Sequence, residues 1–354
     1  MIHLATLLLA AQISVLPAPT PAPSAEPFLF ATNDSLLMSW MEGKSVRFAR
    51  FDGAKWSEPG TIVKRDDLFA NWADFPSIVE DGNGILYAHF LQKSSVGKYS
   101  FDVRMSVSRD GGKTWSESVL INRDGKQAEH GFVSLVPLTQ GGVGIAWLDG
   151  RRKEMSLRYA TVSARGVMAN EVELDGRACE CCATGMAMTS SGPLIAYRDR
   201  SAKEIRDISY VRPGSKLQPL HADGWKIEGC PVNGPQVDAI GDASVIAWFT
   251  GANDKPHVYV AFDGGRPIAV DAGKPVGRVD VVLLDRNTAV VSWLEGDAIR
   301  ARKVMRDGKS EPGVIIAEPS SARASGVARI ARIGREVYFA WTDEKHVRVS
   351  RARF

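Results

Sequence analysis

Long apolar segments are scarce in this chain, which limits the places where it could span a membrane. Only residues 4–16, near the start, form an apolar region, and that region is too short and too interrupted to span a bilayer. No second apolar stretch approaches membrane length. We therefore expect a soluble chain with no transmembrane segment once a leader is removed.

Basic runs, zinc-finger spacings and RRM-type motifs are also missing. The 44 basic and 41 acidic residues are mixed along the 354-residue chain and leave a formal net charge of +3. Because nucleic-acid binding needs clustered positive charge, we expect no nucleic-acid partner. No amphipathic helix pattern stands out either, so the chain does not look helical.

The N-terminus has the pattern of an export signal. Small residues and a proline-rich segment, 17–23, follow the apolar region, and Ala25 could precede a cleavage point. No cysteine follows the apolar region to carry a lipid anchor. We interpret residues 1–25 as a signal peptide and Pro-rich leader, residues 26–354 as one folded domain, and the location as periplasmic or secreted. A poorly ordered tail is the alternative.

A repeat with a period near 50 residues runs along the chain. Seven segments share apolar residues, then a small residue, then usually an aromatic one; they end at Trp40, His89, Trp147, Tyr197, Trp248, Trp293 and Trp341. Runs with alternating side chains follow most of them, and Asp-Gly turns suit hairpins. A sheet of about 50 residues cannot cover both of its faces alone, but sheets stacked around an axis cover one another. The sequence therefore predicts an all-β propeller of four-stranded antiparallel blades, seven in number, with six as the alternative.

Closing such a ring needs a strand from the other end of the chain. The last repeat ends at Phe354, soon after its third strand. The segment 27–32 could complete that blade. If this segment instead begins a blade of its own, the blade count becomes ambiguous.

Residues 108–115 fit the pattern S-x-D-x-G-x-T-W without a mismatch. Glycine supplies positive φ in such a turn, the polar side chains bond turn amides, and the tryptophan packs between blades. The segment resembles the Asp box, or BNR repeat, of sialidases and related propellers. That resemblance implies a structural role on the outer rim for Ser108, Asp110, Gly112, Thr114 and Trp115.

A wider resemblance, to an exported bacterial group of sialidase-like proteins, covers most of residues 35–354. The segments that carry it are 71–77, 129–132, 147–151, 179–182, 197–200, 204–207, 221–225 and 230–235. It implies a glycan or another anionic small ligand at the mouth of the central channel, and no cofactor.

Sialidases hold the substrate carboxylate with three arginines and use a Tyr–Glu nucleophile with an Asp acid/base. Arginine suits the first task because its planar fork binds a carboxylate bidentately. The candidates for substrate binding are Arg151, Arg198, Arg200 and Arg206, and those for catalysis are Asp74, Asp223, Tyr197 and Glu204. The F/Y-R-I-P segment of sialidases is missing, and salt bridges or loop-holding contacts are the alternative for each charge. A non-catalytic periplasmic propeller that binds a ligand or a protein partner is the alternative function.

Four cysteines are present, Cys179, Cys181, Cys182 and Cys230. An even number in an exported chain favours disulfides, with three connectivities open. A bridge between Cys181 and Cys182 would be strained, because adjacent Cα atoms lie about 3.8 Å apart. The alternatives are a soft-metal site for Cu(I) or Zn(II), aided by Met186 or Met188, and a redox thiol pair. No paired CxxC spacing supports zinc.

Overall fold

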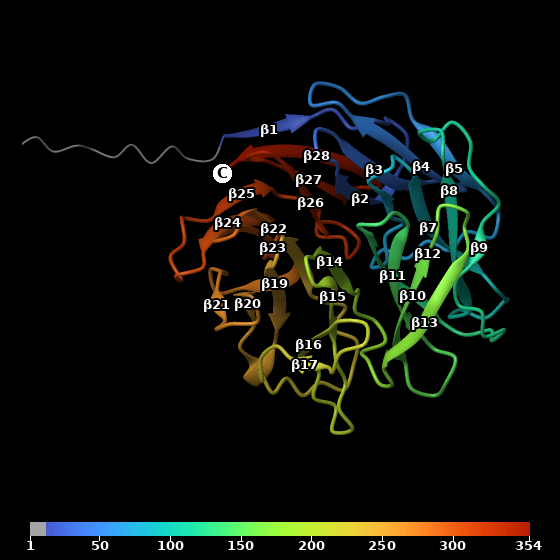
Figure 1. Cartoon of the computed structure of the whole chain (residues 1–354). Helices are drawn as coiled ribbons and strands as arrows, with labels where there is room; N and C mark the ends of the chain where they lie inside the picture. Colours follow the sequence, from blue (N-terminus) through green and yellow to red (C-terminus); the bar gives the residue numbers. More distant parts are fainter. Residues whose placement is uncertain (1–11) are drawn as a thin grey trace, which may run out of the picture.

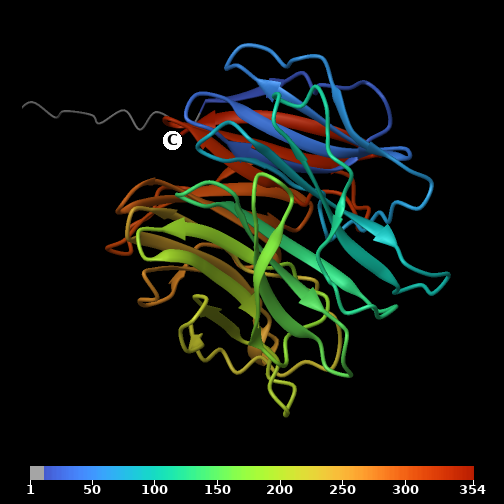
Figure 2. The same ribbon diagram turned by 45° about the vertical axis from the view of Figure 1, so that its right-hand side comes forward.

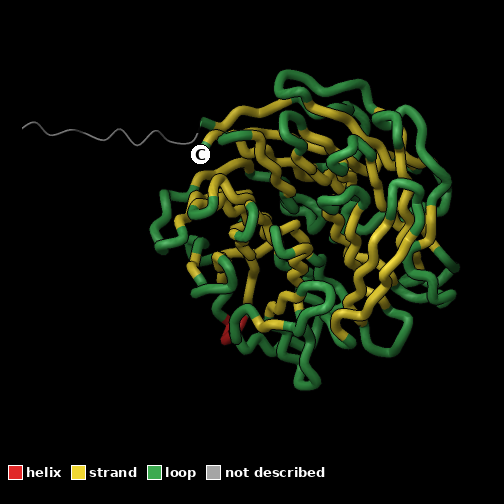
Figure 3. The backbone as a smooth tube through the Cα atoms, in the orientation of Figure 1, coloured by secondary structure: helices red, strands yellow, loops and turns green. Residues whose placement is uncertain are grey.

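The computed structural model describes residues 12–354, which fold almost entirely into antiparallel strands (Figures 1 and 3). Seven four-stranded sheets surround a central axis. Within residues 12–354 the helical structure is limited to one 3₁₀ turn, η1 (Ala252–Asp254), and no helix is long and apolar enough to cross a bilayer. The prediction of a seven-bladed propeller is confirmed, and the six-bladed alternative is wrong.

Six blades are each built from four consecutive strands, counted outward from the axis. The first blade contains β2 (Ala25–Ala31), β3 (Leu36–Glu42), β4 (Ser45–Phe51) and β5 (Gly60–Lys64). The second contains β6 (Ile78–Glu80), β7 (Leu86–Lys93), β8 (Phe101–Ser108) and β9 (Val119–Leu120). The third contains β10 (His130–Pro137), β11 (Val143–Asp149), β12 (Ser156–Val162) and β13 (Met168–Asp175). The fourth contains β14 (Gly185–Thr189), β15 (Gly192–Arg198), β16 (Ile208–Val211) and β17 (Gln218–Pro219). The fifth contains β18 (Gln236–Ile240), β19 (Ala243–Thr250), β20 (His257–Phe262) and β21 (Ile268–Ala269). The sixth contains β22 (Pro275–Asp285), β23 (Thr288–Glu295), β24 (Ala298–Met305) and β25 (Val314–Ala317).

The last blade takes strands from both ends of the chain. It contains β26 (Arg329–Ile333), β27 (Glu336–Asp343), β28 (His346–Arg353) and, outermost, β1 (Ile13–Leu16). β1 pairs antiparallel with β28, and Figure 1 shows the two side by side. The segment 27–32, which the sequence offered as the closing strand, instead contributes to β2, the innermost strand of the first blade. A strand from the N-terminus does close the ring, but it is an earlier one.

The closing strand lies inside the stretch interpreted as a leader. The residues after it contact both neighbouring blades: Ser24 N donates to the Lys345 carbonyl at 2.7 Å, and Thr20 Oγ1 donates to Glu42 Oε2 at 2.7 Å. The propeller in the structure therefore includes residues 13–25, whereas the sequence placed its start at residue 26. Cleavage after Ala25 would remove the outer strand of the last blade.

Each of the seven interfaces between neighbouring blades holds one cluster of buried apolar side chains. The aromatic residues of the repeat lie on the second strand of each blade and, His89 excepted, belong to these clusters. The interface between the last and first blades has a cluster of its own, to which Trp40 and Tyr338 belong. Figure 2 shows these two blades, coloured red and blue, lying against each other. Packing as well as β1 therefore closes the ring.

Candidate functional site at one mouth of the channel

The innermost strands enclose a cavity of about 520 Å³ on the axis of the ring. Strands β2, β10, β14, β18, β22 and β26 supply most of its lining. Its volume is within the range of small-ligand sites. The loops that lead into these strands gather at one mouth of the channel, and they bring together carboxyl groups, arginines and cysteines from distant parts of the chain.

Three carboxyl groups lie at this mouth, those of Asp74 and Glu26, which are buried, and that of Glu129, which is half-buried. Asp74, in the loop before β6, accepts hydrogen bonds from the backbone amides of Phe132 and Val133 in the next blade. Burial raises the pKa of Asp74 to about 6. Burial, followed by the charge of Asp74, raises the pKa of Glu26 to about 8 and that of Glu129 to about 7. Asp74, a candidate from the sequence, thus lies in the channel lining beside two carboxyl groups that can hold protons near neutral pH.

These groups make the stability of the propeller depend on pH. A carboxyl group whose pKa is raised by folding stabilises the fold below that pKa, and this contribution is lost as the pH rises through it. We expect the melting temperature to fall between about pH 5 and about pH 8, the window set by Asp74, Glu129 and Glu26. Glu26→Gln should weaken this dependence, because an amide cannot ionise. Thermal melts at both pH values measure the effect, and equal slopes for the wild type and the variant would contradict it.

Three arginines share the mouth with these acids. The guanidinium groups of Arg278 and Arg323 each lie 5.1 Å from the centre of the Trp72 ring, and that of Arg329 lies 4.7 Å from the Phe75 ring. Over residues 12–354, none of the three has a carboxylate oxygen within the 4.0 Å of an ion pair. Burial, followed by the charge of Arg323, lowers the pKa of Arg278. Both guanidinium groups therefore lie against one indole ring without a carboxylate partner. Arg278 Nη1 donates to the Ser325 carbonyl at 2.6 Å, and Arg323 is exposed.

The substrate-binding arginines proposed from the sequence have partners within the protein instead. Arg198 is fully buried, and Arg151 is largely so. The partners of Arg198 are the carbonyl oxygens of Asn233, Arg206 and Phe249, and those of Arg151 are the carboxylates of Asp149 and Glu171. Neither guanidinium is left free to bind a ligand.

Three arginines do converge on one carboxylate, but that carboxylate belongs to Glu204. Arg177, Arg200 and Arg206 donate to it at 2.9–3.2 Å. Hydrogen bonds from Arg200 and then Arg206 lower the pKa of Glu204 to about 2. The place where a substrate carboxylate could sit among these arginines is therefore taken by a side chain of the same chain.

The remaining catalytic candidates are not brought together with Asp74. The Tyr197 hydroxyl donates to Asp175 Oδ2 at 2.6 Å, and burial followed by the charge of Asp175 raises the pKa of the phenol. Asp223 accepts a hydrogen bond from the Trp248 indole at 2.9 Å and lies 2.8 Å from His221 Nδ1. The structure thus spreads the four candidates over separate places instead of assembling them into one site.

Acidic side chains also accept hydrogen bonds from the buried indoles of other blades. The Trp147 indole donates to Asp149 at 2.8 Å, and the Trp293 indole donates to Glu295 at 2.8 Å. A buried indole N–H needs an acceptor, and the acid two residues along the strand provides it. These carboxylates are therefore occupied within their own blades.

The segment that resembles an Asp box forms a compact turn after β8. Ser108 Oγ donates to Asp110 Oδ1 at 2.8 Å, Gly112 N donates to Ser108 Oγ at 2.8 Å, and Thr114 Oγ1 donates to Asp110 Oδ2 at 2.6 Å. The bonds from Thr114 head the causes that lower the pKa of Asp110 to about 2. The Trp115 ring packs edge-on against Phe48 of the first blade, with centroids 5.6 Å apart. None of these residues lines the axial cavity.

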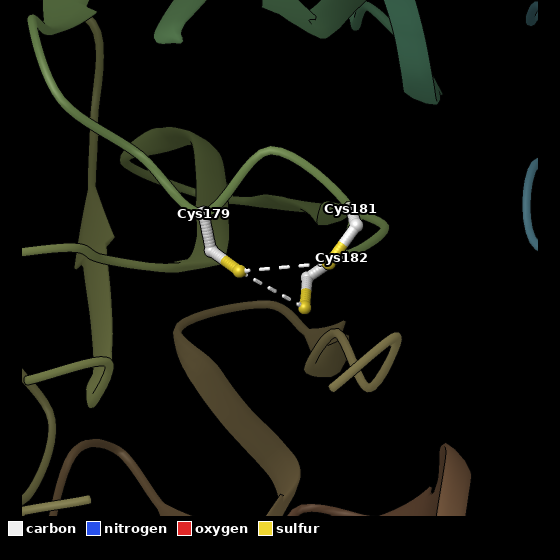
Figure 4. A group of neighbouring side chains, drawn as sticks. All are labelled: Cys179, Cys181 and Cys182. Carbon is white, nitrogen blue, oxygen red and sulfur yellow. Dashed lines mark hydrogen bonds between the residues drawn. The ribbon is translucent and has the colours of Figure 1, made fainter. Parts of the chain in front are cut away.

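The loop 178–184, between β13 and β14, holds three of the four cysteines together (Figure 4). Cys179 Sγ lies 3.4 Å from Cys182 Sγ and 3.9 Å from Cys181 Sγ. Cys230 is exposed and is not part of this group, and all four are free thiols. Three of the four cysteines therefore form one cluster, and we call the loop that holds them, 178–184, the thiol loop.

The residues at this mouth that the sequence analysis did not single out are Trp72, Arg278, Arg323, Arg329, Glu26 and Glu129. Trp72 and Glu129 lie in segments that carried the family resemblance, but neither was assigned a role. The arginines gave no signal, because their loops are up to about 250 residues from Asp74 along the chain and only ring closure brings them to the same mouth.

No family model matches the chain, and no curated protein sequence matches it significantly. Solved structures do. A protein of unknown function from Dyadobacter fermentans has 12% sequence identity and a TM-score of 0.57, with 97% of this chain and 98% of that chain covered. A glucose dehydrogenase has 13% identity and a TM-score of 0.53, with 96% and 99% covered. A puromycin hydrolase mutant has 12% identity and a TM-score of 0.56, with 94% of this chain and 53% of that chain covered. At such identities these likenesses show the propeller fold alone.

Proposed function

We propose that the channel mouth binds an anionic glycan, with the acidic group of the sugar held by Arg278 and Arg323. The observation that carries this proposal is the pair of guanidinium groups over Trp72 with no carboxylate within ion-pair distance. Holding two like charges close together costs free energy, and a ligand carboxylate or sulfate would offset that cost. The proposal places the protein in the periplasm or outside the cell, as its N-terminal sequence predicts.

The surroundings of the pair suit a sugar ring. A small cleft lined by Trp72, Asn233, Arg278 and Arg329 adjoins the axial cavity and shares wall residues with it, among them Ala183 and Gln236. Aromatic faces beside a few convergent polar groups are typical of small-ligand sites. Asn233 Oδ1 accepts the backbone N–H of Arg278 at 2.7 Å, which fixes the backbone that carries this arginine.

A second candidate function, glycoside hydrolysis, is favoured by the carboxyl groups beside this cleft. Hydrolysis needs one protonated and one ionised carboxyl group on either side of the scissile bond. Asp74 is buried and Glu129 is half-buried, and their pKa values, about 6 and about 7, would leave one of them protonated and the other ionised near neutral pH. In this version Asp74 is the acid/base residue and the arginines select the substrate.

The double variant Arg278→Met/Arg323→Met should bind acidic sugars about 10- to 100-fold more weakly than the wild type, because each lost guanidinium removes a charge-assisted hydrogen bond. Calorimetric titration with sialosides, uronides and neutral sugars measures this, and fluorogenic glycosides of the same sugars report turnover. Arg266→Met, which removes an exposed arginine from the outer turn before β21, is the matched control.

Binding without turnover would assign a lectin-like role, and turnover abolished by Asp74→Asn would assign hydrolysis. If the wild type binds none of the acidic sugars, or the double variant binds them as tightly as the wild type does, the proposal is refuted.

A further inference from the structure

We propose that the thiol loop is a three-coordinate site for a soft monovalent metal ion, Cu(I), held by the sulfurs of Cys179, Cys181 and Cys182. The three sulfur atoms lie within 4.8 Å of one another on one short loop (Figure 4). None of the three cysteines lines the axial cavity or the adjoining cleft, so this site is distinct from the proposed glycan site.

The spacing of the sulfurs fits a metal ion better than a disulfide. A metal–sulfur bond of about 2.3 Å in a trigonal plane places sulfur atoms about 4.0 Å apart. The separations from Cys179 Sγ are 3.9 Å to Cys181, which already fits, and 3.4 Å to Cys182, which has to open by about half an ångström. A disulfide needs about 2.05 Å between its sulfurs and would leave the third cysteine unused.

The number of ligands favours Cu(I) over zinc. Structural zinc sites are almost always four-coordinate, whereas thiolates alone suit Cu(I). The group contains three cysteines and no histidine, aspartate or glutamate, within the part of the chain that the structure describes. Cys230, the other sulfur donor of this type, is exposed and lies outside the group.

A buried cation supports negative charge on the sulfurs. Arg206, 2% exposed, directs Nη1 to Cys179 Sγ at 3.2 Å and Nη2 to Glu204 Oε2 at 2.9 Å. Three thiolates with one Cu(I) carry a charge of −2, and the guanidinium offsets part of it. On binding, each thiol that is still protonated releases its proton to solvent, so no oxidant or reductant takes part.

The fold holds the loop in shape and leaves one side open. A Cβ atom at Gly234 would overlap the carbonyl group of Ala183, so the segment from the next blade packs directly against the thiol loop. Cys179 and Cys182 are fully buried, whereas Cys181 is partly exposed. An ion could therefore enter past Cys181 into a site whose other two ligands are already placed.

The test is an anaerobic titration of the reduced full-length protein with Cu(I) in competition with a chromophoric copper chelator. We expect one Cu(I) per chain, a thiolate-to-copper charge-transfer band and three sulfur neighbours by X-ray absorption. Cys230→Ser should bind as the wild type does. Arg206→Met keeps all three ligands and should weaken binding about 10- to 100-fold, as expected of a group that supports a metal ligand, and Cys181→Ser should weaken it further.

Thermal melts of the metal-free variants show whether each one is folded. If Cys181→Ser binds as tightly as Cys230→Ser, the three-sulfur site is refuted. Tighter binding of Zn(II) than of Cu(I), or a Cys179–Cys182 disulfide that forms and persists in place of metal binding, would also overturn the proposal.

Discussion

Deleting residues 1–24 should lower the melting temperature of the propeller by about 5–10 °C, because the deletion removes the closing strand and several hydrogen bonds to both neighbouring blades. β1 pairs with β28 from Ile13 opposite Ala352 to Leu16 opposite Val349. The Trp56 indole also donates to the Pro17 carbonyl at 3.0 Å. Without this segment, the backbone of β28 loses its partner on one side and the last blade keeps three strands.

Deleting residues 1–11 alone is the matched control, because this deletion keeps β1. Calorimetry of both truncated proteins measures the difference. Equal melting temperatures would mean that β1 contributes nothing to closure. N-terminal sequencing of protein exported by a bacterial host adds a second test, because a chain processed after Ala25 cannot contain β1.

Arg198→Met should reduce the free energy of unfolding by about 3 kcal/mol or more, because it leaves buried carbonyl groups without their charged donor. The guanidinium donates to three backbone carbonyls at 2.6–2.9 Å, in two loops and at the end of β19. It also stacks on the Trp225 ring, 4.8 Å from its centre. Urea unfolding followed by tryptophan fluorescence measures the loss.

Arg200→Met is the comparison for this variant. Arg200 is 22% exposed and pairs with Glu180 and Glu204, and exposed pairs of this kind contribute about 1 kcal/mol or less. Arg198→Met should therefore be much the more destabilising of the two. If Arg198→Met instead folds with normal stability and loses only ligand affinity, Arg198 has the binding role that the sequence suggested.

The fold could be predicted because its signal is local and repeated. Each blade carries its own small-then-aromatic step, so one blade that departs from the pattern, such as the one with His89, does not hide the period. The closing strand could not be predicted in the same way. β1 has four residues and one strand partner, and it lies in an apolar stretch with the composition of a signal peptide.

The site was harder to predict, because the role of a charged side chain depends on which groups it contacts in the folded protein. Asp74, a catalytic candidate from the sequence, lines the axial cavity because it lies in the loop before the inner strand of a blade. Nothing in the sequence distinguishes Arg200, which is paired with Glu204, from Arg278, which has no carboxylate partner. That difference arises where loops of several blades meet.

The contacts of the cysteines could likewise be predicted only in part. Three of them fall within four consecutive positions, so their clustering was visible in the sequence. Cys230 lies one repeat later, at a place where neighbouring blades could bring it close to the other three. The structure leaves its side chain exposed, and no sequence pattern reports that exposure.

The thiol loop and the wall of the cavity are parts of one short segment. Directly after Cys182, Ala183 and Thr184 line the cavity, and Thr184 Oγ1 donates to the Phe132 carbonyl at 2.8 Å. The amide of Phe132 is in turn bonded to Asp74. Thermodynamic linkage then imposes a symmetry: if a change at the sulfurs alters affinity in the channel by some factor, filling the channel must alter the affinity of the sulfurs for their ion by the same factor.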